Sequence, residues 1–258
     1  MTKKEAAYSK IRSDIFCRTL SPGTRINISD LAEKYQMSAI PIREALTLLE
    51  TENLVKNTPY RGYVVTNMAF NDLLEYSLIA SELECLALRY AIAYSTEESV
   101  AEVKALQAQL REQFNNGEKE QYVITNRRFH VALYSFAPCS ILLDMIDDMS
   151  KRSYYKQSIL LMVPERIRSS LDEHDDIIAA VEARDTERAV HLLFRHRLNT
   201  LQSLVQAIQQ AIMRPNYQDQ ELLKTFFMED QLKNRSAISG EAQYWDYILS
   251  RLSGPLSN

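Results

Sequence analysis

Residues 38–46 are Ser38-Ala39-Ile40-Pro41-Ile42-Arg43-Glu44-Ala45-Leu46, and this stretch decides the fold of the N-terminal part of the chain. Proline is favoured in the first turn of a helix, so Pro41 marks the start of a helix that is expected to run to about Glu52. Ser38 stands where a hydroxyl can cap that helix. The first turn of this helix is therefore well defined by its sequence.

An earlier helix is expected upstream of this stretch. Ala7, Ile11 and Ile15 recur at helical spacing and indicate a helix from about Lys4 to Leu20. Residues 21–23, Ser-Pro-Gly, end it because proline cannot continue a helix and glycine suits the turn.

A short helix and a hairpin complete the pattern. Residues 27–30 offer an N-cap for a helix over residues 31–35. Further downstream, residues 54–56 and 62–65 are β-like runs, and residues 57–61 form the expected hairpin tip between them. Helix, helix, helix and hairpin is the order of a winged helix-turn-helix domain.

A winged helix-turn-helix places its second helix in the major groove of DNA and its wing beside the backbone or minor groove. Arg43 is the strongest candidate for a base or phosphate contact, because a guanidinium can fork onto guanine or clamp phosphates. A glycine at the wing lets the backbone approach the duplex closely. The expected contacts are Arg43, Ser38, Ala39, Ile40, Pro41, Arg25, Arg61 and Gly62. The alternative is a helix-turn-helix used for protein contacts, with Arg43 in a surface salt bridge.

The same residues carry a family resemblance. Residues 38–46 resemble the S-x-x-P-x-R-E-A-L recognition segment of GntR-family regulators, and residues 20–25, 31–33 and 47–55 are similar to the family's flanking segments. Asn53 stands where the family usually has glycine. Ala39-Ile40 stands where it commonly has Arg-Thr. An apolar pair can touch a thymine methyl but cannot read a guanine, so the resemblance implies an operator that differs from the family's usual core.

Composition and charge agree with two domains, of which one binds DNA. The 258 residues include only five glycines and seven prolines, which favours a mostly helical protein. Residues 1–70 carry ten Lys and Arg against seven Asp and Glu, a balance of +3, whereas the remainder carries 20 against 27, a balance of −7. A basic head on an acidic body suits a protein that offers one end to a polyanion.

The sequence favours a cytoplasmic protein without membrane partners. It has no apolar run of about 18 residues and no signal-peptide core at its start. Cys17, Cys85 and Cys139 are widely spaced and odd in number, so they are expected to be buried reduced thiols.

The fold class expected for the whole chain is mainly α, with an N-terminal winged helix-turn-helix (residues 1–68) and a C-terminal antiparallel all-helical bundle. Amphipathic patterns indicate that residues 71–212 form the bundle, a ligand-sensing and dimerisation domain. Residues 213–258 are a C-terminal extension of unknown role with two expected helices, residues 221–232 and 241–252.

Three of the four histidines stand on different predicted helices of the bundle. His130, His174 and His196 could converge there and bind one divalent transition metal, such as Zn, Ni or Mn. Asn126 lies four residues before His130 and so shares its helix face. The alternative is that the histidines are ordinary hydrogen-bonded core or surface residues. His191 matches no ligand position.

The bundle resembles the FCD sensor domain of the FadR-type GntR subfamily. Phe129-His130, Glu173-His174, Arg184-Asp185 and His196 carry the likeness. It implies that the three histidines, with an acidic residue at the position of Asn126, hold a metal that binds the carboxylate of a small organic acid. Asn126 lacks that charge.

A second departure from the subfamily concerns the effector. The subfamily often places an arginine four residues before the glutamate of its L-E-x-L-A segment, which here is residues 83–87, and this chain has Ala80 there. Arg127, Arg152 and Lys156 could bind the effector instead, or they are ordinary solvent-exposed or salt-bridged residues. The natural ligand therefore need not be a sugar acid or dicarboxylate.

The function expected from these features is a repressor that acts as a homodimer on a near-palindromic double-stranded operator. A small-molecule effector would change the angle between the two DNA-binding heads. One alternative is an effector-independent dimeric DNA-binding protein. Another is a zinc-dependent hydrolase, but there is no His-Glu-x-x-His run, and Glu173, adjacent to His174, would point to another face of the helix. No catalytic residue is expected.

Overall fold

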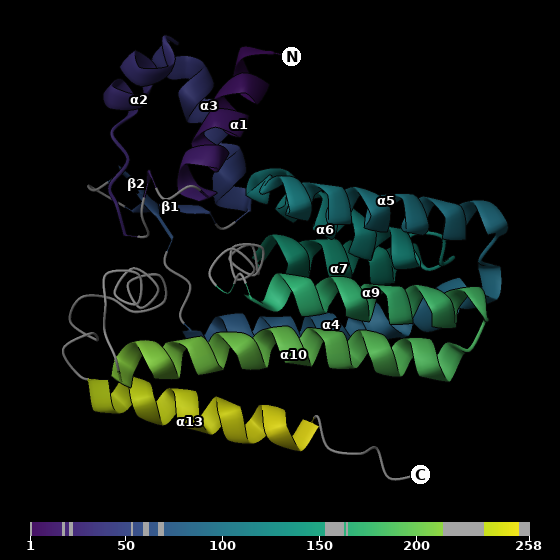
Figure 1. Cartoon of the computed structure of the whole chain (residues 1–258). Coiled ribbons are helices and arrows are strands. Elements are labelled where there is room, and N and C mark those ends of the chain that lie inside the picture. Colours follow the sequence, from purple (N-terminus) through teal and green to yellow (C-terminus); the bar gives the residue numbers. More distant parts are fainter. Residues whose placement is uncertain are drawn as a thin grey trace. The chain divides into compact units, whose positions relative to one another are not determined.

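The computed structural model describes residues 2–16, 19–20, 23–52, 54–58, 62–66, 70–152, 163, 165–213 and 235–252. They form two compact units, one up to Phe70 and one from Asn71 onward. Figure 1 shows the helices and strands of both units. The prediction of a mainly helical protein with a small N-terminal hairpin is confirmed.

The first unit contains three helices and a two-stranded antiparallel sheet. Its elements are α1 (Lys3–Phe16), α2 (Ile28–Tyr35), α3 (Ala39–Thr51), β1 (Val55–Thr58) and β2 (Gly62–Val65). Helix α1 packs on α3; its apolar stripe Ala7, Ile11 and Ile15 is buried, and so are Ile42 and Leu46 on α3. The hydrophobic spacing that predicted α1 is thus the face that builds the core of this unit.

The local signals set the ends of these elements. Asn27 caps α2, because its side chain accepts a hydrogen bond from the backbone N–H of Ser29. Ser38 occupies the N-cap position of α3, but its hydroxyl makes no capping hydrogen bond. Helix α1 ends at Phe16, four residues before its expected end at Leu20.

A third extended segment pairs with the hairpin, and the sequence analysis did not predict it. The backbone N–H of Gly23 donates to the carbonyl of Val65, and Arg25 forms an isolated bridge with Val64. The segment before α2 therefore runs along β2. This pairing fixes Arg25 beside the wing strand. The wing tip, residues 59–61, lies outside the described residues.

The second unit consists of helices. They are α4 (Phe70–Tyr94), α5 (Glu97–Asn116), α6 (Lys119–Tyr134), α7 (Ser140–Arg152), α9 (Glu165–Glu182), α10 (Thr186–Met213) and α13 (Arg235–Leu252). A capping box between Thr96 and Ser99 starts α5, and Gly117, with φ of 72°, ends it. The apolar faces of α4, α5, α6, α9 and α10 meet in one core that includes Leu88, Leu110 and Phe129.

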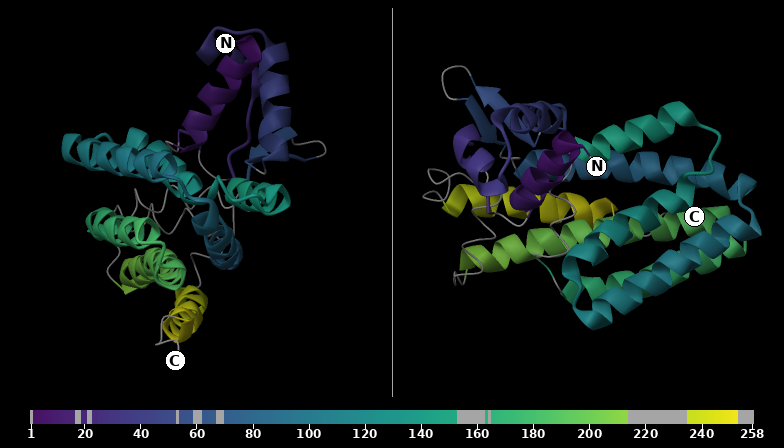
Figure 2. Two further views of the ribbon diagram at one scale, coloured as in Figure 1. Left: turned by 90° about the vertical axis from the view of Figure 1, so that its right-hand side faces the viewer. Right: turned by 90° about the horizontal axis from the view of Figure 1, so that it is seen from above.

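Helix α13 lies along α10, as Figure 1 shows, and the left view of Figure 2 shows α9, α10 and α13 nearly end-on. Ile238, Ala242, Trp245 and Leu249 form its buried stripe. It begins six residues before the helix expected from residue 241. The other expected helix of the extension, residues 221–232, lies outside the described residues. Within the described ranges, no helix has the length and apolarity needed to cross a membrane.

Candidate DNA-binding surface, metal centre and effector cavity

The start of α3 presents a mostly exposed surface. Ser38, Ala39, Ile40 and Arg43 are exposed, and the side chain of Ile40 is 68% accessible. Ile40 is therefore outside the core of this unit, and its side chain is accessible to a partner. Within the described part of the chain Arg43 forms no ion pair, so the salt bridge of the alternative interpretation is absent there.

The sequence analysis expects Pro41 to contact DNA, but the structure does not place it on this surface. It is buried, and a buried ring cannot reach a base, so its role is to start α3 and pack beneath it. Arg25 is exposed beside β2, and Gly62, the first residue of β2, is exposed and has φ of 73°, a conformation that favours glycine. Arg61 lies outside the described residues.

The three histidines of the second unit come together in its interior. His130 on α6, His174 on α9 and His196 on α10 are all buried, and ligand nitrogens from the three rings lie within 4.8 Å of one another. Nitrogens bound about 2.1 Å from one ion lie roughly 3–4 Å apart, so a small movement of these rings would close them on a metal. The sequence prediction that these residues converge agrees with this geometry.

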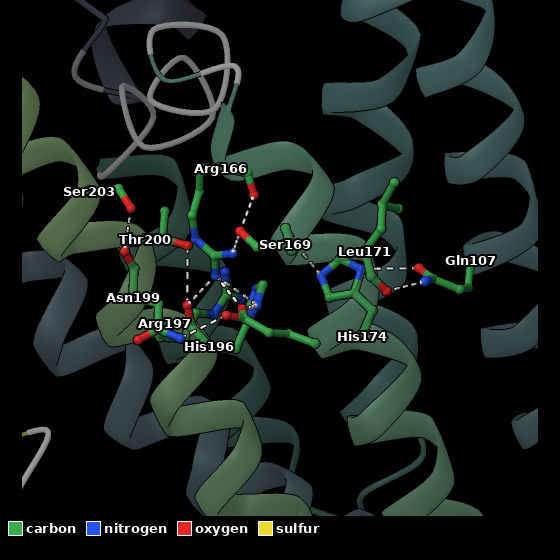
Figure 3. Close-up of polar contacts among 12 residues, drawn as sticks. Gln107, Arg166, Ser169, Leu171, His174, His196, Arg197, Asn199, Thr200 and Ser203 are labelled. Carbon is green, nitrogen blue, oxygen red and sulfur yellow. Dashed lines mark hydrogen bonds and ion pairs between the residues drawn. The ribbon is translucent and has the colours of Figure 1, made fainter.

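Gln107 fixes the protonation of the His174 ring. The Gln107 amide nitrogen donates to the carbonyl of Leu171 at 2.7 Å and to the carboxylate of Asp175 at 2.8 Å. Its amide oxygen must then face Nδ1 of His174, at 3.1 Å, and accept a hydrogen bond from it (Figure 3). Nδ1 carries the hydrogen, and Nε2, which lies 3.4 Å from the Ser170 hydroxyl, keeps the lone pair that a metal needs.

Glu173 fixes the protonation of the His196 ring, as Gln107 does for His174. Its carboxylate oxygen lies 2.7 Å from Nδ1 of His196, and its other oxygen accepts a hydrogen bond from Asn199 at 2.7 Å. Arg166, buried beside them, forms an ion pair with Glu173 and donates to the backbone carbonyl of His196 at 3.1 Å (Figure 3). The Nδ1 position of His196 is thereby held as a donor toward Glu173, which leaves Nε2 for a ligand role.

The surroundings of His174 favour a neutral ring. Burial, with a smaller contribution from the neighbouring His196, holds the pKa of His174 well below its ordinary value. A neutral imidazole is the form that ligates a metal, so the site does not need to lose a proton from His174 before binding.

Asn126 supplies a further oxygen. Its Oδ1 is buried and has no hydrogen-bond partner among the described residues, and the side chain lines the same cavity as His130 and His196. A buried carbonyl oxygen without a partner is costly unless something binds it. The residues present therefore fit a metal with three nitrogen ligands and one amide oxygen.

A cavity of about 350 Å³ adjoins the cluster, between α4, α6, α7, α9 and α10. His130, His196 and Asn126 line it, so a metal held there would face the cavity. Arg127 also lines it and forms an ion pair with Asp147 at 3.1 Å. Ala80, at the position of the subfamily's arginine, is a buried part of its wall. Arg152 ends α7, and its side chain lies outside the described residues, as does Lys156.

Sequence reasoning missed Gln107, Arg166 and Glu173 as parts of this site. Gln107 is one of two glutamines buried on α5, the other being Gln113, and a polar residue at an apolar position is a detectable but unspecific signal. Glu173 does lie on another face from His174, as expected, and that face meets His196 on α10.

A winged helix-turn-helix joined to an all-helical unit defines the class: a DNA-binding protein with a separate helical domain. The sequence model of a protein family, bacterial regulatory proteins of the gntR family, matches residues 3–65. The sequence model of the FCD domain matches residues 78–200. The HTH-type transcriptional regulator McbR of Escherichia coli (strain K12) is 31% identical over 179 residues, which is 67% of this chain and 80% of McbR.

Two further likenesses agree. The HTH-type transcriptional repressor GlaR of the same organism is 28% identical over 211 residues, 78% of this chain and 95% of GlaR. A solved structure of E. coli McbR/YncC has a TM-score of 0.66 at 27% identity, covering 78% of this chain and 96% of that one. The chain therefore belongs to the GntR family, with an FCD domain, and is a DNA-binding transcriptional regulator. These two relatives are named as transcriptional regulators.

Proposed function

We propose that this regulator is a repressor whose affinity for operator DNA is controlled by a small molecule bound in the FCD domain. The observation that carries the proposal is the meeting of three buried histidines beside a cavity of about 350 Å³. A metal held by His130, His174, His196 and Asn126 would supply a Lewis-acidic anchor for an oxygen donor of the effector. The name of GlaR, a repressor, supports the sign of the regulation.

The DNA-binding part of the proposal rests on the exposed start of α3. Arg43 would read a guanine or hold phosphates, while Ala39 and Ile40 would lie against thymine methyl groups, and Ser38, Arg25, Arg61 and Gly62 would contact the backbone. Residues 1–68 would form this head, and a homodimer would set two heads on two half-sites about one helical turn apart. One head alone buries too little surface for selective binding.

The proposal assigns residues 71–212 to sensing and dimerisation. An effector that binds one arrangement of the two FCD domains more tightly than another would change the spacing of the heads, and so their match to the operator. Residues 213–258 include α13, which packs on α10, and so they would act as a brace of the sensor.

The experiment begins with selection of the operator from a random DNA library by the purified full-length protein. Fluorescence anisotropy then measures the Kd on the selected sequence at fixed salt, with and without bound zinc and candidate organic acids. The proposal expects a two-fold symmetric selected sequence and a Kd that rises when an effector binds. Selection of no consensus sequence, or a Kd that no ligand or metal changes, would contradict it.

A further inference from the structure

The charged groups of the FCD cavity are arranged in an unusual way. Among the described residues, two guanidiniums line it, those of Arg127 and Arg197. Each is paired with a carboxylate that lines the same cavity: Arg197 with Glu84 and Arg127 with Asp147. A cavity prepared for a second anionic group would keep at least one arginine available for it.

The ion pair of Arg197 and Glu84 is the more buried of the two. The Nε of Arg197 lies 2.6 Å and its Nη2 lies 2.5 Å from the same carboxylate oxygen, and the Glu84 side chain is only 6% accessible. A ligand carboxylate near Arg197 would meet a guanidinium whose charge is already balanced by Glu84, and displacing Glu84 would leave a buried charge without its partner. The pair therefore offers little net attraction to an anion.

A third carboxylate lines the cavity. Asp144 on α7 lines the cavity and is exposed, and within the described residues it forms no ion pair. Three carboxylates against two guanidiniums leave an excess of one negative charge among the protein's own groups. An ammonium group of a ligand would find Asp144 available, because the other two carboxylates already have partners.

We propose that Glu84, by neutralising Arg197, makes this cavity specific for zwitterions that carry one carboxylate and one ammonium group, and excludes dicarboxylates. The inference rests on the proposed function, which places the effector in this cavity. The carboxylate takes the anchor beside the histidines, and the ammonium group faces Asp144. Glu84 thus acts as a specificity-determining residue through its hold on Arg197.

The test compares three four-carbon acids that differ only at the far end: 4-aminobutyrate, butyrate and succinate. Isothermal titration of the zinc-supplied full-length protein measures each Kd. We expect 4-aminobutyrate to bind at least roughly tenfold more tightly than succinate, with butyrate between them. Succinate binding as tightly as 4-aminobutyrate, or no binding by any of the three, would overturn the proposal.

Two variants locate the effect. Glu84→Gln releases Arg197 and should strengthen succinate binding roughly tenfold. Asp144→Asn, at an exposed position, should remove most of the preference for 4-aminobutyrate over butyrate, whereas Asp148→Asn, also on α7 but outside the cavity wall, should not. If circular dichroism shows that Glu84→Gln does not fold, the Asp144→Asn variant decides whether the proposal holds. An unchanged ratio of the Kd values for butyrate and 4-aminobutyrate in that variant would overturn it.

Repeating the titrations after a chelator has removed the zinc separates the contribution of the metal to binding from that of the protein's own charges. A protein that takes up no zinc contradicts the metal part of the proposed function. In the zinc-loaded protein the anchor is present, so a wrong order of the three acids there overturns only the inference about Glu84, because that order comes from the protein's own charges.

Discussion

The amide oxygen of Gln107 lies 3.1 Å from Nδ1 of His174, and both amide hydrogens of Gln107 are committed to acceptors on α9. The orientation of the amide is therefore not free. Since a hydrogen bond at Nδ1 selects the tautomer with a lone pair on Nε2, one residue on α5 prepares His174 for a metal.

Replacing Gln107 with leucine should weaken metal binding while leaving all three histidines in place. The expected loss is about 10–100-fold in zinc affinity, the usual effect of removing an outer-shell partner. Competition with a chromogenic chelator measures it. Gln113→Leu is the matched control, because Gln113 is also buried on α5 and does not contact the histidines. Equal zinc affinity in Gln107→Leu and the control would show that Gln107 has no positioning role.

Arg43→Ala should weaken binding to the selected operator at least roughly tenfold at matched salt, since a base-contacting arginine contributes about 1–3 kcal/mol. Anisotropy gives the Kd, and circular dichroism should show an unchanged fold because Arg43 is exposed. Arg195→Ala removes an exposed arginine from the FCD domain and serves as the control. Equal affinity of the Arg43 variant and wild type would remove α3 as the recognition helix.

Trp245→Ala should destabilise the FCD domain by about 3–5 kcal/mol, the range for deleting a large buried aromatic side chain. Its ring is 9% accessible, and its Nε1 donates to the Asn71 side chain at 2.6 Å. Urea unfolding followed by circular dichroism measures the free energy. Tyr247→Ala, on the exposed side of α13, should cost less than 1 kcal/mol. Similar losses in the two variants would mean that α13 is not anchored by its buried stripe.

Cys85 should not react with thiol reagents in the folded protein. Burial, aided by the charge of Glu84, raises its pKa to about 12, so at pH 8 the thiolate that would react is almost absent. Titration with a disulfide reagent should give the same native rate for wild type and Cys85→Ser, and one thiol fewer for the variant in denaturant. Loss of a rapidly reacting thiol from the native variant would refute this.

Features carried by local sequence were predictable, and features made by packing between helices were not. Residues 38–46 fixed α3 because proline placement and apolar spacing act within one helix. The same residues could not reveal that Pro41 is buried, which depends on what packs beneath α3.

The site shows the same division. Histidines are rare in this chain, and their places on three expected helices indicated convergence. Helix geometry predicts that Glu173 faces away from His174, and this is a correct statement about one helix. Its contact with His196 exists only because α9 packs on α10. The neutralisation of Arg197 by Glu84, 113 residues earlier in the chain, was likewise beyond sequence spacing.

The metal content per chain tests the central claim most directly. Protein purified without chelator or affinity metal is analysed by elemental mass spectrometry, beside His174→Ala prepared in the same way. The account predicts about one transition metal per wild-type chain and a clear loss in the variant. Wild type that holds no metal after incubation with zinc, nickel and manganese, or a variant with equal metal content, would contradict it.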